Sequence, residues 1–247
     1  MSVHIEHCMG TVFTIDIRDS GDWADAVDAV VAWLQFVDAT FSTYRPDSDV
    51  SRIRRGELRV AEAAPEVAEV LDLCAAAQRT TGGFFTGQPD GRLDPTGLVK
   101  GWAIERASGL LHDLGSHNHA VNGGGDMQLA GAAGPDRPWT VGISDPQDPS
   151  SVLSMVTGRD FAVATSGISE RGRHIVNPFT GQAAAAGVLS VTVVGPTLTE
   201  TDAYATAAFA MGKAALHWVE SLAGYEAMVV ADGNGTSQTS GWPAVSA

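Results

Sequence analysis

Residues 201–212 read Thr201-Asp202-Ala203-Tyr204-Ala205-Thr206-Ala207-Ala208-Phe209-Ala210-Met211-Gly212, and they predict a helix because Ala, Phe and Met dominate and a glycine ends the run. Asp202 and Thr206 are four residues apart, so their side chains lie on one helix face. Two short oxygen ligands on an otherwise apolar helix can bind a hard cation such as Mg²⁺. Alternatively, Asp202 is an N-cap or first-turn acid and Thr206 bonds back to a backbone carbonyl. Spacing alone favours this structural alternative, so the rest of the sequence must decide.

Short β-like segments surround this helix. They lie at His119–Val121, Met127–Leu129, Trp139–Ile143, Val152–Val156, Phe161–Ala164, Val188–Val194 and, as the last strand, Ala227–Ala231. A partner helix is predicted from Ala214 to Leu222. The tail from Gly233 is rich in Gly, Ser and Thr, and we expect it to be loose or draped on the surface.

Helices dominate the N-terminal half. An alternating strand at Thr11–Ile17 precedes an amphipathic helix from Trp23 to Phe41. Two further helices are predicted, from Pro65 to Gly82 and from Val99 to Leu111, and the intervening segments Ser42–Ile53 and Thr81–Pro95 are predicted to be loops. Early helices and later short strands do not alternate as in a doubly wound sheet. The pattern indicates an α+β fold with one domain over residues 1–232 and a tail over residues 233–247.

The charge balance excludes some partners. The 247 residues include 29 acidic and 15 basic side chains, which gives a net charge of −14. This argues against a nucleic-acid or anionic-membrane surface. An anionic substrate would need a local cation, which is a second, weak indication of a metal. The two cysteines lack the spacing of a metal site, and we expect them to be reduced thiols that pack in the fold. We expect neither a membrane helix nor a leader peptide, and we therefore predict a cytoplasmic protein.

Two glycine-containing segments could bind a phosphate. The run Asn122-Gly123-Gly124-Gly125-Asp126 follows a short strand, and its missing Cβ atoms would let a phosphate or a flat ring approach backbone N–H groups. A tight hairpin turn explains the same residues equally well. The segment from Asp94 to Trp102 places an acid and Lys100 where a helix begins, and a helix N-terminus attracts anions. Here the alternative is an ordinary helix start.

A third region combines hydroxyls with a histidine. Thr165-Ser166-Gly167 closes a strand, and the segment from His174 to Gly181 follows shortly after it. A serine hydrolase would need a G-x-S-x-G elbow, which the chain lacks. A lone histidine is more often structural than catalytic, and the histidines at 4, 7, 112, 117 and 119 are expected to lie on the surface.

Taken in order, these segments resemble the FAD:protein FMN transferase (ApbE) family. The matching segments are Met9-Gly10-Thr11, Phe41 to Arg45 with Ser48 and Ser51-Arg52, Asp94 to Trp102, Asn122 to Asp126, Thr165 to Gly167 with Glu170-Arg171, His174 to Gly181, and Asp202 to Gly212. They extend over nearly the whole chain. The resemblance implies a single ApbE-like domain, related to the T-fold, with a mixed or antiparallel sheet and packed helices.

The resemblance also implies an activity and roles for residues. Family members bind FAD, use Mg²⁺ and transfer the FMN half to a Thr or Ser hydroxyl of a target flavoprotein, releasing AMP. By motif, Asp202, Thr206 and the carbonyl of Gly97 resemble the metal ligands, and His174 resembles the general base. The residues that resemble FAD contacts are Met9, Tyr44, Phe84, Phe85, Asp94, Lys100, Asn122, Gly123, Gly124, Gly125, Thr165 and Ser166.

Several positions depart from the family pattern. Thr86 stands where an acid usually follows the aromatic, and the connection from Thr86 to Asp94 is short. Ile168, Asn177 and Thr201 also replace the residues that are usual in the family. The candidate metal ligands and the histidine are all retained. Two alternative functions are kept. One is an FAD pyrophosphatase, in which water replaces the protein hydroxyl, because sequence separates these two nucleophiles poorly. The other is a non-catalytic FAD-binding protein, because of the departures at Thr86 and Ile168.

Overall fold

An antiparallel sheet of eight strands forms the centre of the computed structural model, which describes residues 2–168, 175–181, 187–233 and 235–243. The strands follow the order β1-β2-β3-β4-β7-β8-β9-β10. Their bounds are β1 Ser2–Cys8, β2 Thr11–Ile17, β3 His119–Gly123, β4 Asp126–Ala130, β7 Phe161–Gly167, β8 Val188–Gly195, β9 Glu226–Ala231 and β10 Thr236–Gln238. All seven neighbouring pairs are antiparallel.

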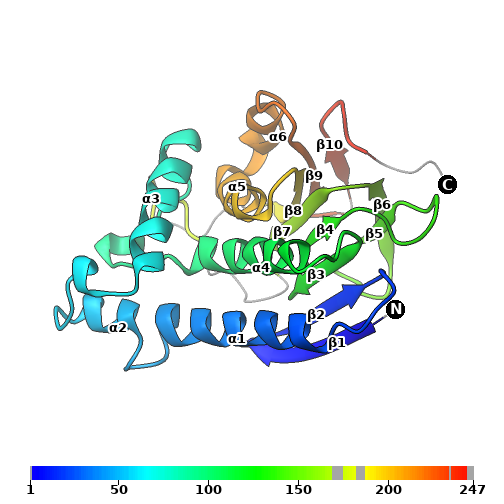
Figure 1. Ribbon diagram of the computed structural model, residues 1–247. Helices are drawn as coiled ribbons and strands as arrows, with labels where there is room; N and C mark the ends of the chain where they lie inside the picture. The colour runs from blue at the N-terminus through cyan, green and yellow to red at the C-terminus, as the bar shows by residue number, and fades with distance from the viewer. Residues whose placement is uncertain (1, 169–174, 182–186, 234, 244–247) are drawn as a thin grey trace.

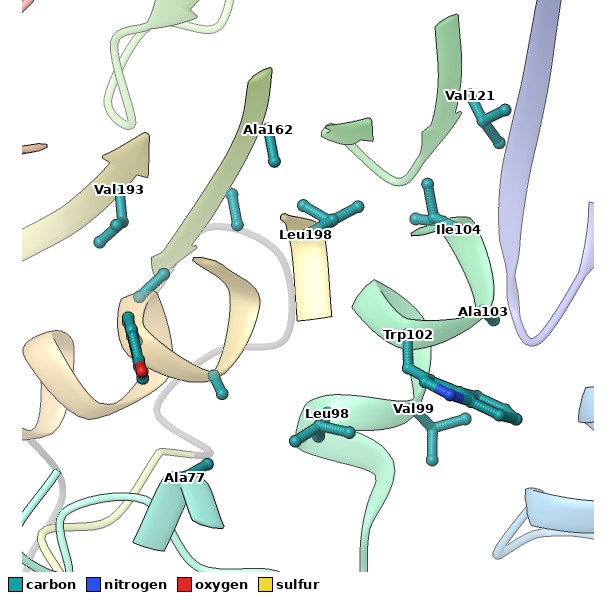
Figure 2. Packing of buried hydrophobic residues seen from close by; sticks show 14 of the residues in the cluster. Ala77, Leu98, Val99, Trp102, Ala103, Ile104, Val121, Ala162, Val193 and Leu198 are labelled. Carbon is teal, nitrogen blue, oxygen red and sulfur yellow. The ribbon is translucent and has the colours of Figure 1, made fainter. Parts of the chain in front are cut away.

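Helices cover one face of this sheet. Figure 1 shows α1 (Ala24–Phe41), α4 (Thr96–Asp113) and α5 (Leu198–Met211) side by side. The other helices, α2 (Asp49–Arg54), α3 (Pro65–Thr80) and α6 (Ala215–Val219), lie around them. In Figure 2, Val121, Ala162 and Val193 of the sheet point toward the helices that carry Ile104 and Leu198. These side chains belong to the main hydrophobic core, whose burial from water is the chief stabilising contribution to the fold.

The strand pattern explains why one face is apolar. In β2, Phe13, Ile15 and Ile17 are fully buried beneath the helices, whereas Thr14 and Asp16 point to the other face. This is the alternation that a period of two residues produces. The predicted strand and the α+β class are therefore confirmed.

A second, smaller core covers the opposite face. The hairpin of β5 (Trp139–Ser144) and β6 (Val152–Gly158) packs there, and Trp139, Val141 and Val156 are buried with Met228 of β9. Trp242 of the C-terminal segment is buried in the same core and donates a hydrogen bond from Nε1 to Ser154 Oγ at 3.1 Å. Of the two expectations for the tail, loose or draped on the surface, the loose one is wrong for this segment, because the indole of Trp242 packs into the second core.

Other differences from the sequence prediction are local. Asp49–Arg54 forms α2 inside the predicted loop, because the Ser48 side chain accepts a hydrogen bond from Ser51 N and caps the helix. Strands β1 and β10 were not predicted. His119 is buried rather than on the surface, between the hydroxyls of Ser108 and Ser116. Among the described residues, we find no helix whose length and apolar character suit a membrane span.

Candidate functional site

A cavity of about 670 Å³ brings together most of the residues singled out from the sequence. It lies between the start of α4, the inner face of α5 and the end of β7. Of the predicted residues, its lining includes Phe84, Phe85, Asp94, Gly97, Lys100, Thr165, Ser166, Asp202 and Thr206. Segments more than 100 residues apart in the chain therefore meet at one site.

Helix α5 contributes the two candidate metal ligands. Asp202 lies one turn beyond the first residue of the helix, Leu198, and the N-cap position is Thr197. The capping interpretation of Asp202 is therefore wrong. Its buried carboxylate Oδ2 instead accepts a hydrogen bond from Gly101 N of α4 at 3.0 Å. Thr206 also lines the cavity, and its hydroxyl lies 3.3 Å from Ser166 Oγ.

Gly101 makes the approach of α4 to α5 possible. A Cβ at this position would lie 2.6 Å from the backbone oxygen of Leu198 and 2.8 Å from Asp202 Cβ. Neither distance is sterically acceptable, so only glycine fits where the two helices meet. Its bare backbone brings the N–H within reach of the Asp202 carboxylate. Gly101 is therefore a site residue that the sequence reasoning included in a motif but did not identify.

The N-terminal end of α4 faces the cavity. Asp94 Oδ1 accepts hydrogen bonds from Thr96 N at 3.2 Å and from Thr96 Oγ1 at 2.6 Å, an Asx turn that leads into the helix, whose N-cap position is Pro95. Thr96 and Gly97 line the cavity directly behind it. The N-terminal partial positive charge of an 18-residue helix is thus available to an anion. In the fold, Asp94 forms this turn, and its role toward FAD stays a prediction.

Lys100 is oriented by an acid that the site prediction missed. Its Nζ lies 2.5 Å from Asp126 Oδ2, and Asp126 is almost completely buried. The other carboxylate oxygen of Asp126 accepts a hydrogen bond from Thr165 N at 2.9 Å. Asp126 therefore links α4, β4 and β7 at the cavity wall. The sequence signal that could have identified Asp126 is its position directly after the three glycines.

The glycine run itself forms the turn between β3 and β4. Gly124 and Gly125 have φ values of 62° and 95°, and Asn122 Oδ1 accepts a hydrogen bond from Gly125 N at 3.0 Å. The hairpin interpretation is thus confirmed. At Gly123 a Cβ would lie 2.6 Å from the Phe13 ring, so this glycine is required for packing. None of these residues lines the cavity.

Met9 and Tyr44 also lie outside the cavity lining. Met9 is in the turn between β1 and β2, and Gly124 N donates to Val12 O at 3.2 Å, so the two turns are neighbours at one end of the sheet. The Tyr44 side chain is 93% exposed. The cavity therefore does not unite the Met9 turn and the glycine turn with Asp202.

Aromatic side chains line the cavity on its outer side. The rings of Phe84 and Phe179 meet edge to face with centroids 4.9 Å apart, and Phe179 is 64% exposed. Phe85 is buried, and a Cβ on Gly97 would lie 3.4 Å from its ring. Phe84 is therefore placed to contact a planar ligand group, whereas Phe85 supports the backbone of Gly97 from below.

The predicted base, His174, lies outside the described residues. Among the histidines that are described, His119 cannot serve at this site, because burial lowers its pKa to about 4 and both ring nitrogens contact serine hydroxyls.

The two thiols fit the predicted packing role. Cys74 is buried, which raises its pKa to about 12, and Cys8 Sγ contacts Leu34 O at 3.3 Å.

The donor chemistry of the cavity suits a hard cation. The candidate ligands in its lining are the Asp202 carboxylate, the Thr206 hydroxyl and the backbone carbonyl of Gly97, which are oxygen donors of the kind that Mg²⁺ prefers. Within the part of the chain that the structure describes, no group of three His, Cys, Asp or Glu side chains could hold a metal. An ion here would therefore complete its coordination with water and substrate oxygens.

Comparison with known proteins identifies similar chains. The ApbE family model matches residues 9–89 and 86–229. The FAD:protein FMN transferase of Vibrio cholerae is 31% identical over 134 residues, which cover 51% of this chain and 40% of that relative. The FAD:protein FMN transferase of Rhodobacter capsulatus is 30% identical over 205 residues, covering 79% of this chain and 36% of the relative. The matched part thus spans less than half of these relatives.

Solved structures share the fold. The flavin transferase ApbE from Vibrio cholerae superposes with a TM-score of 0.84 at 22% identity, and 97% of each chain is covered. The ApbE protein from Thermotoga maritima gives the same TM-score, identity and coverage. At this level of identity the likeness establishes the architecture, including the antiparallel sheet with its helical layer.

Proposed function

The chain belongs to the ApbE family, and from this membership we propose that it transfers the FMN half of FAD to a Thr or Ser hydroxyl of a target flavoprotein and releases AMP. One observation carries the proposal. Asp202 and Thr206 face a single cavity together with Gly97 and Lys100 from the start of α4. This arrangement combines oxygen donors for a cation with groups that bind an anion.

A divalent cation fits the proposal as a cofactor. We propose that the side chains of Asp202 and Thr206 and the carbonyl of Gly97 hold Mg²⁺. When bound, Mg²⁺ would supply Lewis-acid polarisation and neutralise charge on the diphosphate. The net charge of −14 makes such local neutralisation necessary, because the protein as a whole repels an anionic substrate.

The protein's own groups would bind the diphosphate of FAD. The N–H groups at the start of α4 present partial positive charge, and Lys100 adds an ammonium group that its ion pair with Asp126 holds in position. The hydroxyls of Thr165 and Ser166 also line the cavity and can donate to phosphate oxygens. These groups are fixed before the substrate arrives, which favours stabilisation of charge that develops during reaction.

The chemical step exchanges one phosphorus–oxygen bond for another. The acceptor hydroxyl oxygen forms a bond to the phosphorus on the flavin side, and the bond from that phosphorus to the bridging oxygen breaks. AMP leaves with the bridging oxygen, and the proton of the hydroxyl passes to a base. By family resemblance we propose His174 for this role. With water as the nucleophile, the same step would yield free FMN and AMP.

The remaining predicted FAD contacts are part of the same proposal. Phe84 would contact a ring of FAD, and Phe85 would act indirectly through Gly97. Met9, Tyr44 and the turn Asn122–Gly125 would contact the part of the dinucleotide that extends beyond the cavity. The closeness of the Met9 and glycine turns supports treating them as one subsite.

The test is a mass measurement on an acceptor flavoprotein. We would incubate the protein with FAD, Mg²⁺ and the acceptor, and expect the acceptor to gain the mass of one FMN less one water as AMP is released. An acceptor whose target Thr is replaced by Val should gain nothing. Release of FMN and AMP at the same rate with and without the acceptor, and without an adduct, would instead identify a pyrophosphatase and refute the proposal.

A further inference from the structure

The two edges of the main sheet differ in how well they are protected. At one edge, β10 has only three residues, and all three are polar and exposed. At the other edge, β1 has seven residues, without a proline or a lysine. Monomeric proteins usually shorten or charge an edge strand, since its free backbone groups can pair with another chain. Only β10 follows this rule.

The exposed face of β1 is apolar. Val3 and Ile5 are 56% and 60% exposed, and both lie on the face opposite to the helices. Val12 of the adjoining strand is also exposed, opposite His7 in the register. Among the described residues, β2 is the one strand that pairs with β1, so the outer edge of β1 is open to a partner.

From this edge we infer that β1 pairs with β1 of a second copy of the chain, in an antiparallel dimer whose two-fold axis passes beside Ile5. Among the described residues, the register with Ile5 opposite Ile5 of the partner gives every residue of β1 from Ser2 to Cys8 a counterpart. A closed, isologous dimer of this kind extends the sheet across both subunits.

The side chains that this register places opposite each other are also compatible. His4 falls opposite Glu6 of the partner, beside the 3.6 Å contact that His4 makes with Glu6 of its own chain, and the symmetry repeats this arrangement on the helix-side face. Val3 falls opposite the partner's His7, which leaves Ile5 at the centre of an apolar stripe. Directly opposed residues of these kinds stabilise antiparallel strands, whereas like charges destabilise them.

Helix α1 extends the same surface. Gln35 Nε2 donates to Glu6 Oε1 at 3.4 Å, so this part of α1 lies next to the helix-side face of β1. Phe36 is a large exposed side chain beside it, and its ring centroid is 5.7 Å from that of Trp33. Pairing of the strands would bring the two α1 helices together and cover these rings.

Disulfide cross-linking tests the position of the axis. In a Cys8→Ser background, Ile5→Cys places two thiols directly opposite each other, with Cα atoms about 5 Å apart, within disulfide range. Val3→Cys is similarly exposed, but its Cα would be about 14 Å from that of its symmetry mate, which lies four residues along the paired strand. We expect oxidation to yield a covalent dimer from Ile5→Cys and none from Val3→Cys. Equal cross-linking of both variants, or of neither, would overturn the inference.

Charge reversal provides a second measurement that does not depend on Ile5. Sedimentation velocity over a dilution series should show a concentration-dependent dimer, whose dissociation constant rises about tenfold in His4→Glu, since symmetry counts each new repulsion twice. The double variant His4→Glu, Glu6→His should restore it to within about threefold. Leu114→Glu, at another exposed apolar site (53% exposed), is the control and should dimerise normally. A chain that is monomeric at every concentration, or a dimer indifferent to His4→Glu, would refute the proposal.

Discussion

Replacing Asp202 by asparagine should remove Mg²⁺-dependent activity and leave the fold almost unchanged. Asparagine has nearly the same shape, and its amide oxygen can still accept the 3.0 Å hydrogen bond from Gly101 N. The bond to a neutral acceptor is weaker by about 1 kcal/mol. For a chain of this size, that loss lowers Tm by about 2–4 °C. The negative charge offered to the cation is lost completely.

Asp202→Ala separates the structural contribution from the chemical one. Without an acceptor, the buried Gly101 N–H is left unpaired, which costs about 2 kcal/mol of unfolding free energy. The expected decrease in Tm is therefore about 4–8 °C, clearly larger than for asparagine. Both variants should nevertheless lose activity to the same extent, because neither supplies a carboxylate to the metal.

The expected loss of activity follows from the contribution of the cation. Lewis-acid stabilisation of the phosphoryl transition state contributes several kcal/mol. At about 1.4 kcal/mol for each factor of ten, kcat should fall by about 10² to 10⁴. The assay is the rate of FMN addition to the acceptor, measured by mass over a series of Mg²⁺ concentrations. The half-saturating Mg²⁺ concentration should rise in both variants.

Glu200→Gln is the matched control. It removes a carboxylate from the same helix, but Glu200 contacts the hydroxyl of Tyr225 at 2.5 Å and is outside the cavity lining. Its transfer rate and Mg²⁺ dependence should equal those of the unchanged protein. If Asp202→Asn kept its rate and its Mg²⁺ dependence, or if Glu200→Gln lost as much activity as Asp202→Asn, the assignment of Asp202 as a metal ligand would be wrong.

Three other predictions concern residues around this site and in the two cores. Asp126→Asn should raise the KM for FAD about tenfold, which corresponds to about 1.4 kcal/mol, because it weakens the ion pair that positions Lys100. Lys100→Met should raise the KM at least as much. Trp242→Ala should cost about 3 kcal/mol in a denaturant titration, with the initial rate at low temperature unchanged, because its core lies on the other face of the sheet. Burial lowers the pKa of His119 from 6.5 to about 4, so the unfolded chain binds this proton first as the pH falls. The unfolding free energy should therefore decrease by up to about 3 kcal/mol between pH 6.5 and pH 4 through this residue, and the decrease should be smaller in His119→Gln.

Each of these has a result that would contradict it. An unchanged KM in Asp126→Asn would mean that Lys100 is positioned by other groups. A stability loss below about 1 kcal/mol in Trp242→Ala would mean that the C-terminal segment does not complete the second core. Parallel pH profiles of unfolding for the unchanged protein and His119→Gln would mean that His119 titrates normally in the fold.

Elements with a strong local pattern were predictable, and the exceptions have physical causes. β2 and α1 each show the period of their own backbone, because one face of each is buried. β10 has no buried side chain, so it has no pattern to read. It is held by contacts made elsewhere, such as the hydrogen bond from Ala227 N to Thr239 Oγ1 at 2.9 Å just after the strand. β1 does alternate, but with its apolar residues exposed, as expected of an interface rather than of a core.

The site shows the same division between local and distant information. Asp202 and Thr206 were predictable as a pair, because helical spacing alone places them on one face. The ion pair between Lys100 and Asp126 was not, because it depends on how α4 crosses the hairpin of β3 and β4. Likewise, nothing in the run Asn122–Asp126 distinguishes a glycine required for packing from one required for a ligand. That distinction needs the neighbouring side chains, here the ring of Phe13 against Gly123.

Gly101 connects the packing of the helices to the chemistry proposed for the cavity. A carboxylate buried between two helices is costly unless its oxygen atoms are hydrogen-bonded, and the backbone N–H of Gly101 provides such a bond for Asp202. The N–H can approach only because this residue has no Cβ to strike Leu198 O. The same contact that allows α4 and α5 to pack closely therefore orients the acid before any ligand arrives. It also fixes how far the Asp202 carboxylate lies from two other residues of α4. Gly97 is one helical turn before Gly101, and Lys100 is adjacent to Gly101. Loss of this close approach would disturb metal ligands and phosphate-binding groups together, so the glycine and the acid must act as one unit.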